Sequence, residues 1–536
     1  MAKSQTNGAA SRPETGVTSA HAAAPFDPSH LPHTLAEALF AARARYGGNR
    51  PVLEGHDGQI LTYNALIVAA HALARKLAAI SRRGECVGVL LPTSIGAVVV
   101  LFALQFGART PAMLNYTASL DTLRASCDLA RVRTILTSRR FVREAHLQKL
   151  IDLLAKDRSV IFIEDLIAQL SWLDRLVAFV HAHAPQAFPN REPNSAAVVL
   201  FTSGTTGDPK GVVLSHANLL ANIEQCRRHT PFDPSWVFFN TLPSFHAFGL
   251  TGGVLLPLLS GLKTVLYPSP LHRETIPVLI DKTQANVLIA TDTFAAYYVQ
   301  AAKPGALTSL RYVVIGAERV RNSTREAVAA ASPAAVIEGY GATECAPVVA
   351  VNQPDANRHG AVGRLLPGIE IRIEPVAGLT EGGLLFVRGP NVMEGYLRPD
   401  GGIEPPPDGW FDTGDLVTLD EDGFLSIVGR LKRFARIGAE MVSLARVEAH
   451  AQCIWPMAQH AAIVASAGKD ADQIVLVTDQ PDATKAPLIA WAQERGVRLL
   501  ELPQHIIIIE QMPVLPTGKT DYSAIRSMLA ERFCKT

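Results

Sequence analysis

A run of glycine and hydroxyl residues, Thr202-Ser203-Gly204-Thr205-Thr206-Gly207, leads into Lys210. Such a loop can turn backbone N–H groups and side-chain hydroxyls inward around phosphate oxygens, and the lysine adds a mobile positive charge. Its spacing is not that of a P-loop, where Lys and Ser or Thr directly follow the second glycine. An apolar stretch at 197–201 before the run, and a helix after it that Ser215 could cap, favour an ordered phosphate-binding loop over a flexible surface loop.

A second group of residues could bind a metal ion beside a nucleotide. Tyr340-Gly341-Ala342-Thr343-Glu344 is expected on a turn that follows a short apolar strand at 336–337. Mg²⁺ prefers carboxylate oxygen, with phosphate and water completing its shell, so Glu344 is a candidate ligand. A single glutamate in a loop is more often simply solvated. The order of this stretch after the phosphate loop is what favours the functional interpretation.

A third group pairs a carboxylate with an arginine. Asp415 ends the run Gly409-Trp410-Phe411-Asp412-Thr413-Gly414-Asp415, and Arg430 follows it. A carboxylate can accept hydrogen bonds from both hydroxyls of a ribose, and an arginine can close on the sugar from the other side. The alternative is a structural ion pair across a hairpin.

In this order the motifs resemble those of the adenylate-forming superfamily of acyl-CoA synthetases, luciferases and peptide-synthetase adenylation domains. The resemblance implies an ATP site made of Thr202, Ser203, Gly204, Thr205, Thr206, Gly207, Lys210, Glu338, Gly339, Tyr340, Asp415 and Arg430. Of these, Glu338, Gly339 and Tyr340 would line the adenine slot. Asp415 and Arg430 would hold the ribose.

The resemblance also implies roles for five residues. Glu344 would bind Mg²⁺, and Thr343 would contact the phosphates of ATP. Lys519, in a Leu-Pro-Thr-Gly-Lys run, would hold the carboxylate and the α-phosphate during adenylation. Lys432 stands at the hinge between two domains. His246 stands beside the acyl substrate, and the alternative there is a satisfied core histidine.

The elements that position these motifs alternate between helix and strand. Helices are expected at 35–45, 66–79 and 216–227, and strands at 86–91, 134–137, 196–201, 263–267, 287–290 and 312–315. This alternation predicts an α/β fold with layered, mostly parallel sheets. Short strands at 369–373, 383–388 and 424–428 predict a small β-rich subdomain. From 442 onward, helices at 444–451 and 486–493 with strands at 461–465 and 474–478 predict a smaller, mobile α+β lid.

The expected divisions are a disordered leader at 1–28, an N-terminal AMP-binding domain at 29–430 and a C-terminal lid domain at 431–536. The leader is rich in Ala, Ser, Thr, Gly and Pro, and it lacks the apolar core of a signal peptide. The apolar stretch at 87–108 contains Pro92 and Gln105 and begins like a strand. It therefore predicts a strand, a turn and a buried helix instead of a membrane span.

Composition narrows the function classes. The net charge of +1 argues against a general electrostatic grip on nucleic acid or anionic lipid, although a local basic patch stays open. The six cysteines show no CxxC spacing, which excludes a zinc ribbon and a disulfide framework. We therefore expect a cytoplasmic protein, with loose association with the inner face of the membrane as an open alternative.

Within the superfamily, the chain is most similar to the synthetase half of bacterial acyl-acyl-carrier-protein synthetase/2-acylglycerophosphoethanolamine acyltransferase proteins. The sequence segments on which this likeness rests lie at 115–117, 239–253, 316–320 and 429–444. One departure is Ala439 where most of the superfamily has glycine, with Gly438 one position earlier. Ala resists backbone angles that glycine adopts, so the loop that lines the thioester tunnel could differ in shape.

The resemblance implies a ligase that uses ATP and Mg²⁺ to convert a fatty acid to acyl-adenylate and pyrophosphate. The acyl group would then pass to the phosphopantetheine thiol of acyl carrier protein, whose acidic surface would suit the basic residues Lys432, Arg433 and Arg436. The near alternative is a long-chain fatty acid–CoA ligase, and the remote one is a non-catalytic nucleotide-sensing relative.

Overall fold

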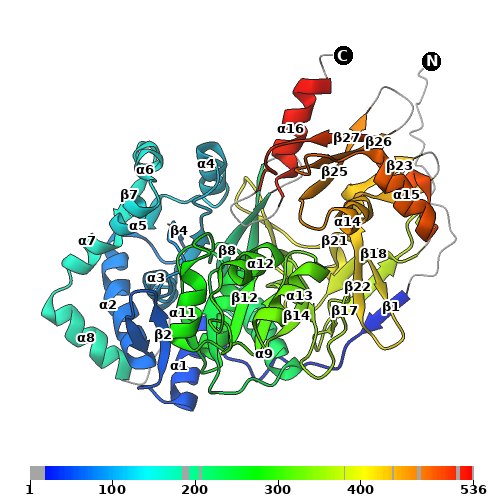
Figure 1. Ribbon diagram of the computed structural model, residues 1–536. Helices are drawn as coiled ribbons and strands as arrows, with labels where there is room; N and C mark the ends of the chain where they lie inside the picture. The colour runs from blue at the N-terminus through cyan, green and yellow to red at the C-terminus, as the bar shows by residue number, and fades with distance from the viewer. Residues whose placement is uncertain are drawn as a thin grey trace, which may run out of the picture.

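The computed structural model describes residues 19–183, 192–203, 208–379, 381–437, 440–466, 472–514 and 520–533. The described chain forms two large, mainly parallel sheets with helices around them, a five-stranded antiparallel sheet, and a C-terminal unit (Figure 1). This arrangement confirms the predicted α/β class. Strands predicted at 134–137, 287–290, 312–315 and 383–388 are confirmed with the same bounds.

The first large sheet has nine strands in the order β16-β15-β14-β13-β12-β10-β11-β2-β3. The strands from β14 to β2 pair in parallel, and β3, β15 and β16 join antiparallel. The bounds are β2 Pro51–Gly55, β3 Ile60–Thr62, β10 Val237–Asn240, β11 Lys263–Leu266, β12 Val287–Ala290, β13 Tyr312–Ile315, β14 Ala335–Gly341, β15 Val348–Val351 and β16 Arg364–Leu365.

The second large sheet has eight strands in the order β20-β19-β9-β8-β5-β4-β6-β7. The strands from β8 to β7 pair in parallel, while β9, β19 and β20 extend the sheet antiparallel. The bounds are β4 Cys86–Val89, β5 Thr110–Met113, β6 Thr134–Thr137, β7 Ser159–Phe162, β8 Ala196–Ser203, β9 Pro209–Ser215, β19 Gly395–Leu397 and β20 Ile403–Glu404.

Helices cover both large sheets, and one apolar core joins the two sheets through helices α1, α2, α3 and α9. The helix bounds are α1 Leu35–Tyr46, α2 Tyr63–Ile80, α3 Ile95–Phe106, α4 Leu120–Leu129, α5 Arg139–Glu144, α6 Gln148–Leu154, α7 Ile163–Ala168, α8 Trp172–His183, α9 His216–His229, α10 Leu256–Leu259, α11 Thr275–Thr283, α12 Asp292–Ala301 and α13 Asn322–Ala331. The predicted cap of α9 is confirmed, because Ser215 and Asn218 form a reciprocal capping box.

The predicted β-rich subdomain is an antiparallel sheet in the order β1-β17-β18-β21-β22. Its strands are β1 Ser19–Ala22, β17 Glu370–Glu374, β18 Gly383–Arg388, β21 Phe411–Leu419 and β22 Leu425–Arg430. Strand β1 corrects the prediction of a disordered leader at 1–28, because it pairs with β17. The chain that follows β1 also packs on this sheet: the Phe26 side chain lies against Gly368 and under the Arg228 guanidinium. Residues 1–18 lie outside the described residues.

The C-terminal unit has apolar clusters of its own, all of whose buried members fall between Ala435 and Leu529. Its elements are β23 Phe434–Ile437, β24 Glu440–Ser443, α14 Leu444–Ile454, β25 His460–Ser466, β26 Asp472–Thr478, α15 Lys485–Arg495, β27 His505–Ile508 and α16 Tyr522–Phe533. Figure 1 shows this unit in orange and red, beside the five-stranded sheet.

Membrane crossing was considered at the sequence level for residues 87–108. These residues form β4 and α3 with a turn between them, as predicted. Among the described residues, no helix combines the length and the apolar character that a membrane span requires.

Candidate active site

The predicted phosphate loop connects two strands of a hairpin. Thr202 at the end of β8 pairs with Lys210 on β9, and Ser203 pairs with Pro209. Lys210 therefore belongs to a strand and not to the loop itself, and β9 separates the loop from helix α9. The sequence predicted the helix that Ser215 caps but did not predict strand β9 before it. Gly204, Thr205, Thr206 and Gly207 lie outside the described residues.

The candidate metal ligand and the phosphate-loop lysine meet at one tyrosine. Tyr396 on β19 donates a hydrogen bond from its hydroxyl to Glu344 Oε1 at 2.7 Å. The Lys210 ammonium lies 4.6 Å from the centre of the same ring, a cation–π distance. The pairing of Tyr396 with Val212 on β9 brings the two groups together. The backbone N–H of Met393 donates to the Glu344 carbonyl at 2.8 Å, which fixes the turn that carries Glu344.

Sequence analysis missed Tyr396. Its pKa is raised well above the usual value, first by burial and then by the neighbouring Glu344 carboxylate, so the phenol stays protonated and donates. No spacing rule links a tyrosine to a glutamate so far away along the chain. Only the pairing of β19 with β9 creates the contact.

The candidate ribose residues form an ion pair in register. Asp415 on β21 and Arg430 on β22 are Cα partners, and Arg430 Nε donates to Asp415 Oδ1 at 2.8 Å. Tyr340 Oη donates to Asp415 Oδ2 at 2.6 Å, so both carboxylate oxygens have a donor. Asp415 is 4% exposed, whereas the Arg430 side chain is 67% exposed.

Electrostatics couple this pair to the rest of the site. The pKa of Arg430 is raised, chiefly by the Asp415 charge, and the charge of Glu344 contributes in the same direction. The pKa of Tyr340 is raised well above its ordinary value by burial first and by Asp415 second. The ion pair across a hairpin that the sequence left as an alternative is therefore present. It also contacts Tyr340, a residue of the predicted adenine slot.

The residues of the predicted adenine slot lie together on one strand, but the Glu338 side chain has partners of its own. Glu338, Gly339 and Tyr340 all lie on β14, which corrects the prediction of a turn at Tyr340. The Glu338 carboxylate is buried, forms an ion pair with Arg325 on α13 and accepts the Gly360 N–H at 3.0 Å. Its side chain is therefore bound within the fold.

Gly339 and Thr343 lie on either side of Tyr340 along the chain. A side chain at Gly339 would place its Cβ 3.3 Å from Val351 on β15, so the glycine allows close packing there. Thr343 and Glu344 follow β14 in a single 3₁₀ turn, Thr343–Cys345.

His246 precedes a π-helix, η1, that spans Phe248–Leu255. Its ring lies 4.6 Å from the Phe245 ring, which meets Tyr116 edge-on at 4.9 Å. A Cβ at Gly249 would lie 2.3 Å from the Pro243 carbonyl oxygen, so this turn requires glycine. π-Helical turns often occur at functional sites. The half-buried His246 thus borders an aromatic, apolar region, and the core-histidine alternative stays open.

The stretch around the predicted hinge is anchored at both ends. Arg430 binds Asp415 in the five-stranded sheet, while Arg433 binds Glu448 on α14 at 2.7 Å. Lys432 lies between them in a 3₁₀ turn and is exposed.

The position of Arg433 contradicts its predicted place on a surface that binds acyl carrier protein. Its guanidinium lies 3.8 Å from the centre of the Tyr522 ring, and its side chain is 20% exposed. These contacts lie inside the C-terminal unit, so Arg433 is not available to an acidic partner. The Arg436 side chain, Gly438, Ala439 and Lys519 lie outside the described residues.

A magnesium ion would fit this site with Glu344 as its one protein carboxylate. Among the described residues, no cluster of three or more His, Cys, Asp or Glu side chains could hold a metal ion. Mg²⁺ commonly uses one or two carboxylates and completes its octahedral shell with phosphate oxygens and water. The single carboxylate beside the phosphate-loop lysine has this character.

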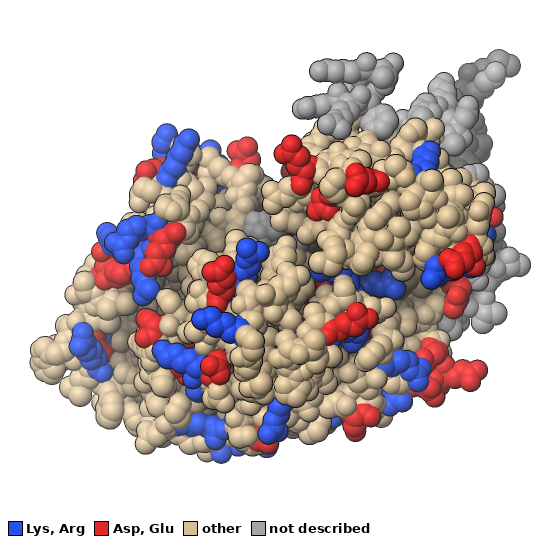
Figure 2. All heavy atoms as spheres, in the orientation of Figure 1, with Lys and Arg blue, Asp and Glu red and all other residues tan. Residues whose placement is uncertain are grey.

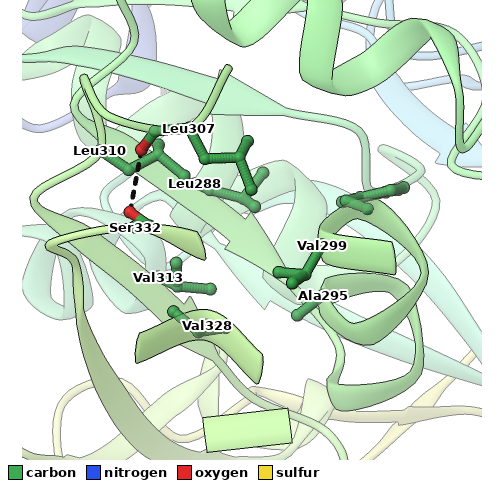
Figure 3. Close-up of a pocket in the computed structure, with 9 residues that line it drawn as sticks. Leu288, Ala295, Val299, Leu307, Leu310, Val313, Val328 and Ser332 are labelled. Carbon is green, nitrogen blue, oxygen red and sulfur yellow. Dashed lines mark hydrogen bonds between the residues drawn. The ribbon is translucent and has the colours of Figure 1, made fainter. Parts of the chain in front are cut away.

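One small apolar cavity lies away from all these residues. It is enclosed between α12, α13 and the strands β12 and β13 (Figure 3). Its polar group Ser332 Oγ already donates to the Leu307 carbonyl at 2.9 Å. It is therefore a gap in the packing of the core rather than a ligand site.

Comparisons with known proteins agree with this geometry. The probable CoA ligase CCL5 of Humulus lupulus is 28% identical over 476 residues, which cover 83% of this chain and 84% of that protein. The long-chain-fatty-acid–CoA ligase of Salmonella typhimurium is 31% identical over 340 residues, and these cover 60% of each protein.

Two solved structures share the fold. ATP-bound MatB from Rhodopseudomonas palustris matches with a TM-score of 0.79 and 24% identity, covering 92% of this chain and 98% of that one. The anthranilate CoA ligase AuaEII in complex with anthranoyl-AMP matches with a TM-score of 0.81 and 19% identity, covering 95% and 100%. The family model of AMP-binding enzymes matches residues 40–397, well over half of the protein. The chain belongs to the AMP-binding enzyme family.

Proposed function

We propose that this protein is an ATP-dependent acid–thiol ligase that activates a fatty acid as its acyl-adenylate. The observation that carries the proposal is the meeting of distant motifs. Tyr396 joins Glu344 to Lys210. Tyr340, on the strand that precedes the Glu344 turn, binds the Asp415 carboxylate that pairs with Arg430. A site with a cation for phosphates, a carboxylate for Mg²⁺ and a second carboxylate for ribose suits ATP.

In the first step, a carboxylate oxygen of the fatty acid attacks the α-phosphorus of ATP. The bond from this phosphorus to the bridging oxygen breaks, and pyrophosphate leaves. Lys210 would stabilise the charge on the leaving group, while Asp415 and Arg430 would hold the ribose. Mg²⁺ bound by Glu344 would neutralise phosphate charge. The protein supplies position and charge and forms no covalent bond to the substrate.

In the second step, a phosphopantetheine thiol attacks the acyl carbonyl. The bond between the carbonyl carbon and the AMP oxygen breaks, the thiol proton is released, and AMP leaves. We propose that Lys519 holds the carboxylate and the α-phosphate in the first step and is withdrawn in the second, as the C-terminal unit turns about Lys432.

Two observations support a fatty acid as the substrate. The rings of Phe245 and Tyr116 give His246 an apolar neighbourhood that suits a hydrocarbon chain. The relative from Salmonella typhimurium is by name a long-chain-fatty-acid–CoA ligase.

The acceptor is proposed to be coenzyme A. Two curated relatives are named as CoA ligases, and Arg433, which the carrier-protein hypothesis needed at the surface, is held by Glu448. The alternative, acyl carrier protein, depends on the sequence likeness at 429–444. Comparing kcat/KM for the two thiols with one acid decides between them.

The test of the ligase proposal is pyrophosphate–ATP exchange with Mg²⁺ and a series of saturated acids from eight to eighteen carbons. We expect exchange that depends on the acid and has an optimum along the series. p-Hydroxybenzoate serves as the contrasting acid. No exchange with any fatty acid, or faster exchange with the aromatic acid, would contradict the fatty-acid assignment.

A further inference from the structure

Helix α8 carries a row of exposed apolar side chains. Trp172, Leu173, Leu176, Phe179 and Val180 are each between 50% and 71% exposed. Their spacing places all five on one face of the helix. Single exposed apolar residues are ordinary, but a contiguous row of this kind marks an interaction surface.

The opposite face of α8 is fixed to the large domain. Ala178 and Ala182 are fully buried, and Asp174 forms ion pairs with Arg75 at 3.1 Å and Lys76 at 2.7 Å, both on α2. The hydrogen bonds from these two side chains and from Ser171 lower the pKa of Asp174, so its carboxylate stays ionised. The helix therefore cannot turn its apolar row into the core.

Helices α2 and α8 carry more basic than acidic side chains, while the neighbouring α7, Ile163–Ala168, carries Glu164 and Asp165. Helices α2 and α8 together contain three arginine and lysine residues, Arg75, Lys76 and Arg175, against the single carboxylate of Asp174. That carboxylate is turned inward and neutralised by two of the three cations. Arg175 is exposed beside the apolar row, and so is His183. An approaching surface thus meets apolar side chains and cations, with no exposed acid on either helix.

We propose that α8 docks this protein on an anionic lipid surface, lying along the interface with its apolar row among the acyl chains. Aromatic and aliphatic side chains on one face, with basic groups beside them, are the features of an interfacial helix. Tryptophan favours the boundary between headgroups and acyl chains, because one end of its ring is apolar and the other can donate a hydrogen bond. The helix has twelve residues, too few to cross a bilayer. Figure 1 places α8 at the rim of the large domain, away from α14 and α15.

This local surface is compatible with the near-neutral charge of the whole chain. Figure 2 shows basic and acidic side chains interspersed over the face in view, so the attraction depends on one helix and not on the net charge. Apolar burial then supplies most of the binding free energy, and anionic headgroups add to it.

The test is co-sedimentation of the full-length protein with phosphatidylcholine vesicles that contain phosphatidylglycerol, without ATP or fatty acid. Its outcome is therefore independent of the proposed reaction. We expect Leu176→Ser/Phe179→Ser to weaken the partition coefficient at least about tenfold, because two apolar side chains no longer enter the lipid. Leu271→Ser/Val278→Ser, two residues that are 61% and 54% exposed elsewhere, is the matched control and should bind like the wild type.

Quenching of tryptophan fluorescence shows directly whether α8 enters the lipid. Brominated acyl chains should quench the wild type, while Trp172→Phe should pellet equally well but lose most of that quenching, because Phe keeps the apolar row and removes the reporter. Failure of the wild type to bind would overturn the proposal. So would equal binding by the Leu176/Phe179 variant, or a change from dimer to monomer in that variant with no loss of binding. The last outcome would identify α8 as a contact between two copies.

Discussion

Within the described part of the chain, one neutral donor orients the Glu344 carboxylate. The Tyr396 hydroxyl donates to one of its oxygens at 2.7 Å, and burial keeps that hydroxyl protonated. The ring below the hydroxyl meets Lys210, so one residue aligns a candidate metal ligand and a phosphate-binding cation. Tyr396 contacts both of these residues, so we expect it to act through them as a positioning residue.

Replacing Tyr396 with Phe separates these two contacts. The ring and its contact with Lys210 remain, but the hydrogen bond to Glu344 is lost. A hydrogen bond to a charged group contributes about 1.5–3 kcal/mol, so we expect kcat/KM for ATP to fall about ten- to a hundredfold. The apparent KM for Mg²⁺ in pyrophosphate–ATP exchange should rise as well.

Tyr297→Phe, at a half-buried position of α12, is the matched control for loss of a phenolic hydroxyl and should leave exchange unchanged. If Tyr396→Phe weakened ATP use but left the Mg²⁺ dependence as in the wild type, the positioning role would be wrong.

How far the sequence predicted the site depends on the residue. Asp415 and Arg430 were predicted as a ribose-binding pair, with an ion pair across a hairpin as the alternative, and the pairing of β21 with β22 makes them Cα partners. Glu338 was assigned to adenine by its motif, yet its carboxylate binds Arg325. A sequence motif gives the order of residues along a strand. It does not show which of their side chains are already bound by a neighbouring helix, as Glu338 is by Arg325 on α13.

At the scale of elements, strands with a clear apolar pattern could be predicted. Strands β6 and β12 are buried along their whole length, so each is a continuous apolar run and was predicted with its bounds. Strand β9 begins Pro-Lys-Gly, a composition that disfavours strands, and it forms because β8 and β19 flank it. Strand β1 is the short sequence Ser-Ala-His-Ala, and its partner β17 lies far away along the chain.

Strand β1 gives a prediction about truncation. A chain that starts at Ser19 keeps β1 and should melt like the full-length protein. A chain that starts at Ser29 loses β1, the packing of Phe26, and the backbone bonds from Ala23 to Ile369 and from Gly368 to Ala24. It also exposes the edge of β17.

We expect the Ser29 truncation to lower the melting temperature by at least about 2 °C and to aggregate more readily. Differential scanning calorimetry of the three chains checks this. Equal melting of the two truncations would show that β1 contributes nothing to stability.

The contact between α2 and α8 gives a prediction about pH. His71 on α2 stacks on Phe106 with ring centres 4.1 Å apart, and His181 of α8 lies 6.0 Å away. Burial, with a smaller effect from His181, lowers the pKa of His71 from 6.5 to about 4. Between these values the unfolded chain binds a proton that the folded chain does not. Stability from this group is therefore complete above pH 6.5 and is lost as the pH falls toward 4.

His71→Phe should flatten the fall in melting temperature between pH 7 and pH 5, because the ring still stacks on Phe106 but no longer titrates. His33→Phe, an exposed histidine near α1, is the control and should keep the wild-type slope. Identical slopes for His71→Phe and the wild type would refute the assignment.

For the whole molecule, the arrangement around Lys432 divides the chain into two bodies. Arg430 holds the chain to Asp415 on one side, and two residues beyond Lys432 the chain enters β23 of the C-terminal unit. Ion pairs such as Arg433–Glu448 and Arg498–Glu440 close within that unit. Rotation about the exposed Lys432 would therefore leave both bodies intact, as the two-step mechanism requires.

Two variants test that rotation by opposite effects. Lys432→Pro fixes φ at the hinge, so acyl-adenylate formation should continue while transfer to the thiol slows.

Lys519→Ala removes a charged donor from the first step and should slow adenylation by about 10²–10³. Supplied with presynthesised acyl-adenylate, Lys519→Ala should transfer the acyl group at close to the wild-type rate. Matching circular dichroism and melting curves establish that both variants fold. If each variant slowed both half-reactions to the same extent, the two steps would share one arrangement and the moving C-terminal unit would be the wrong mechanism.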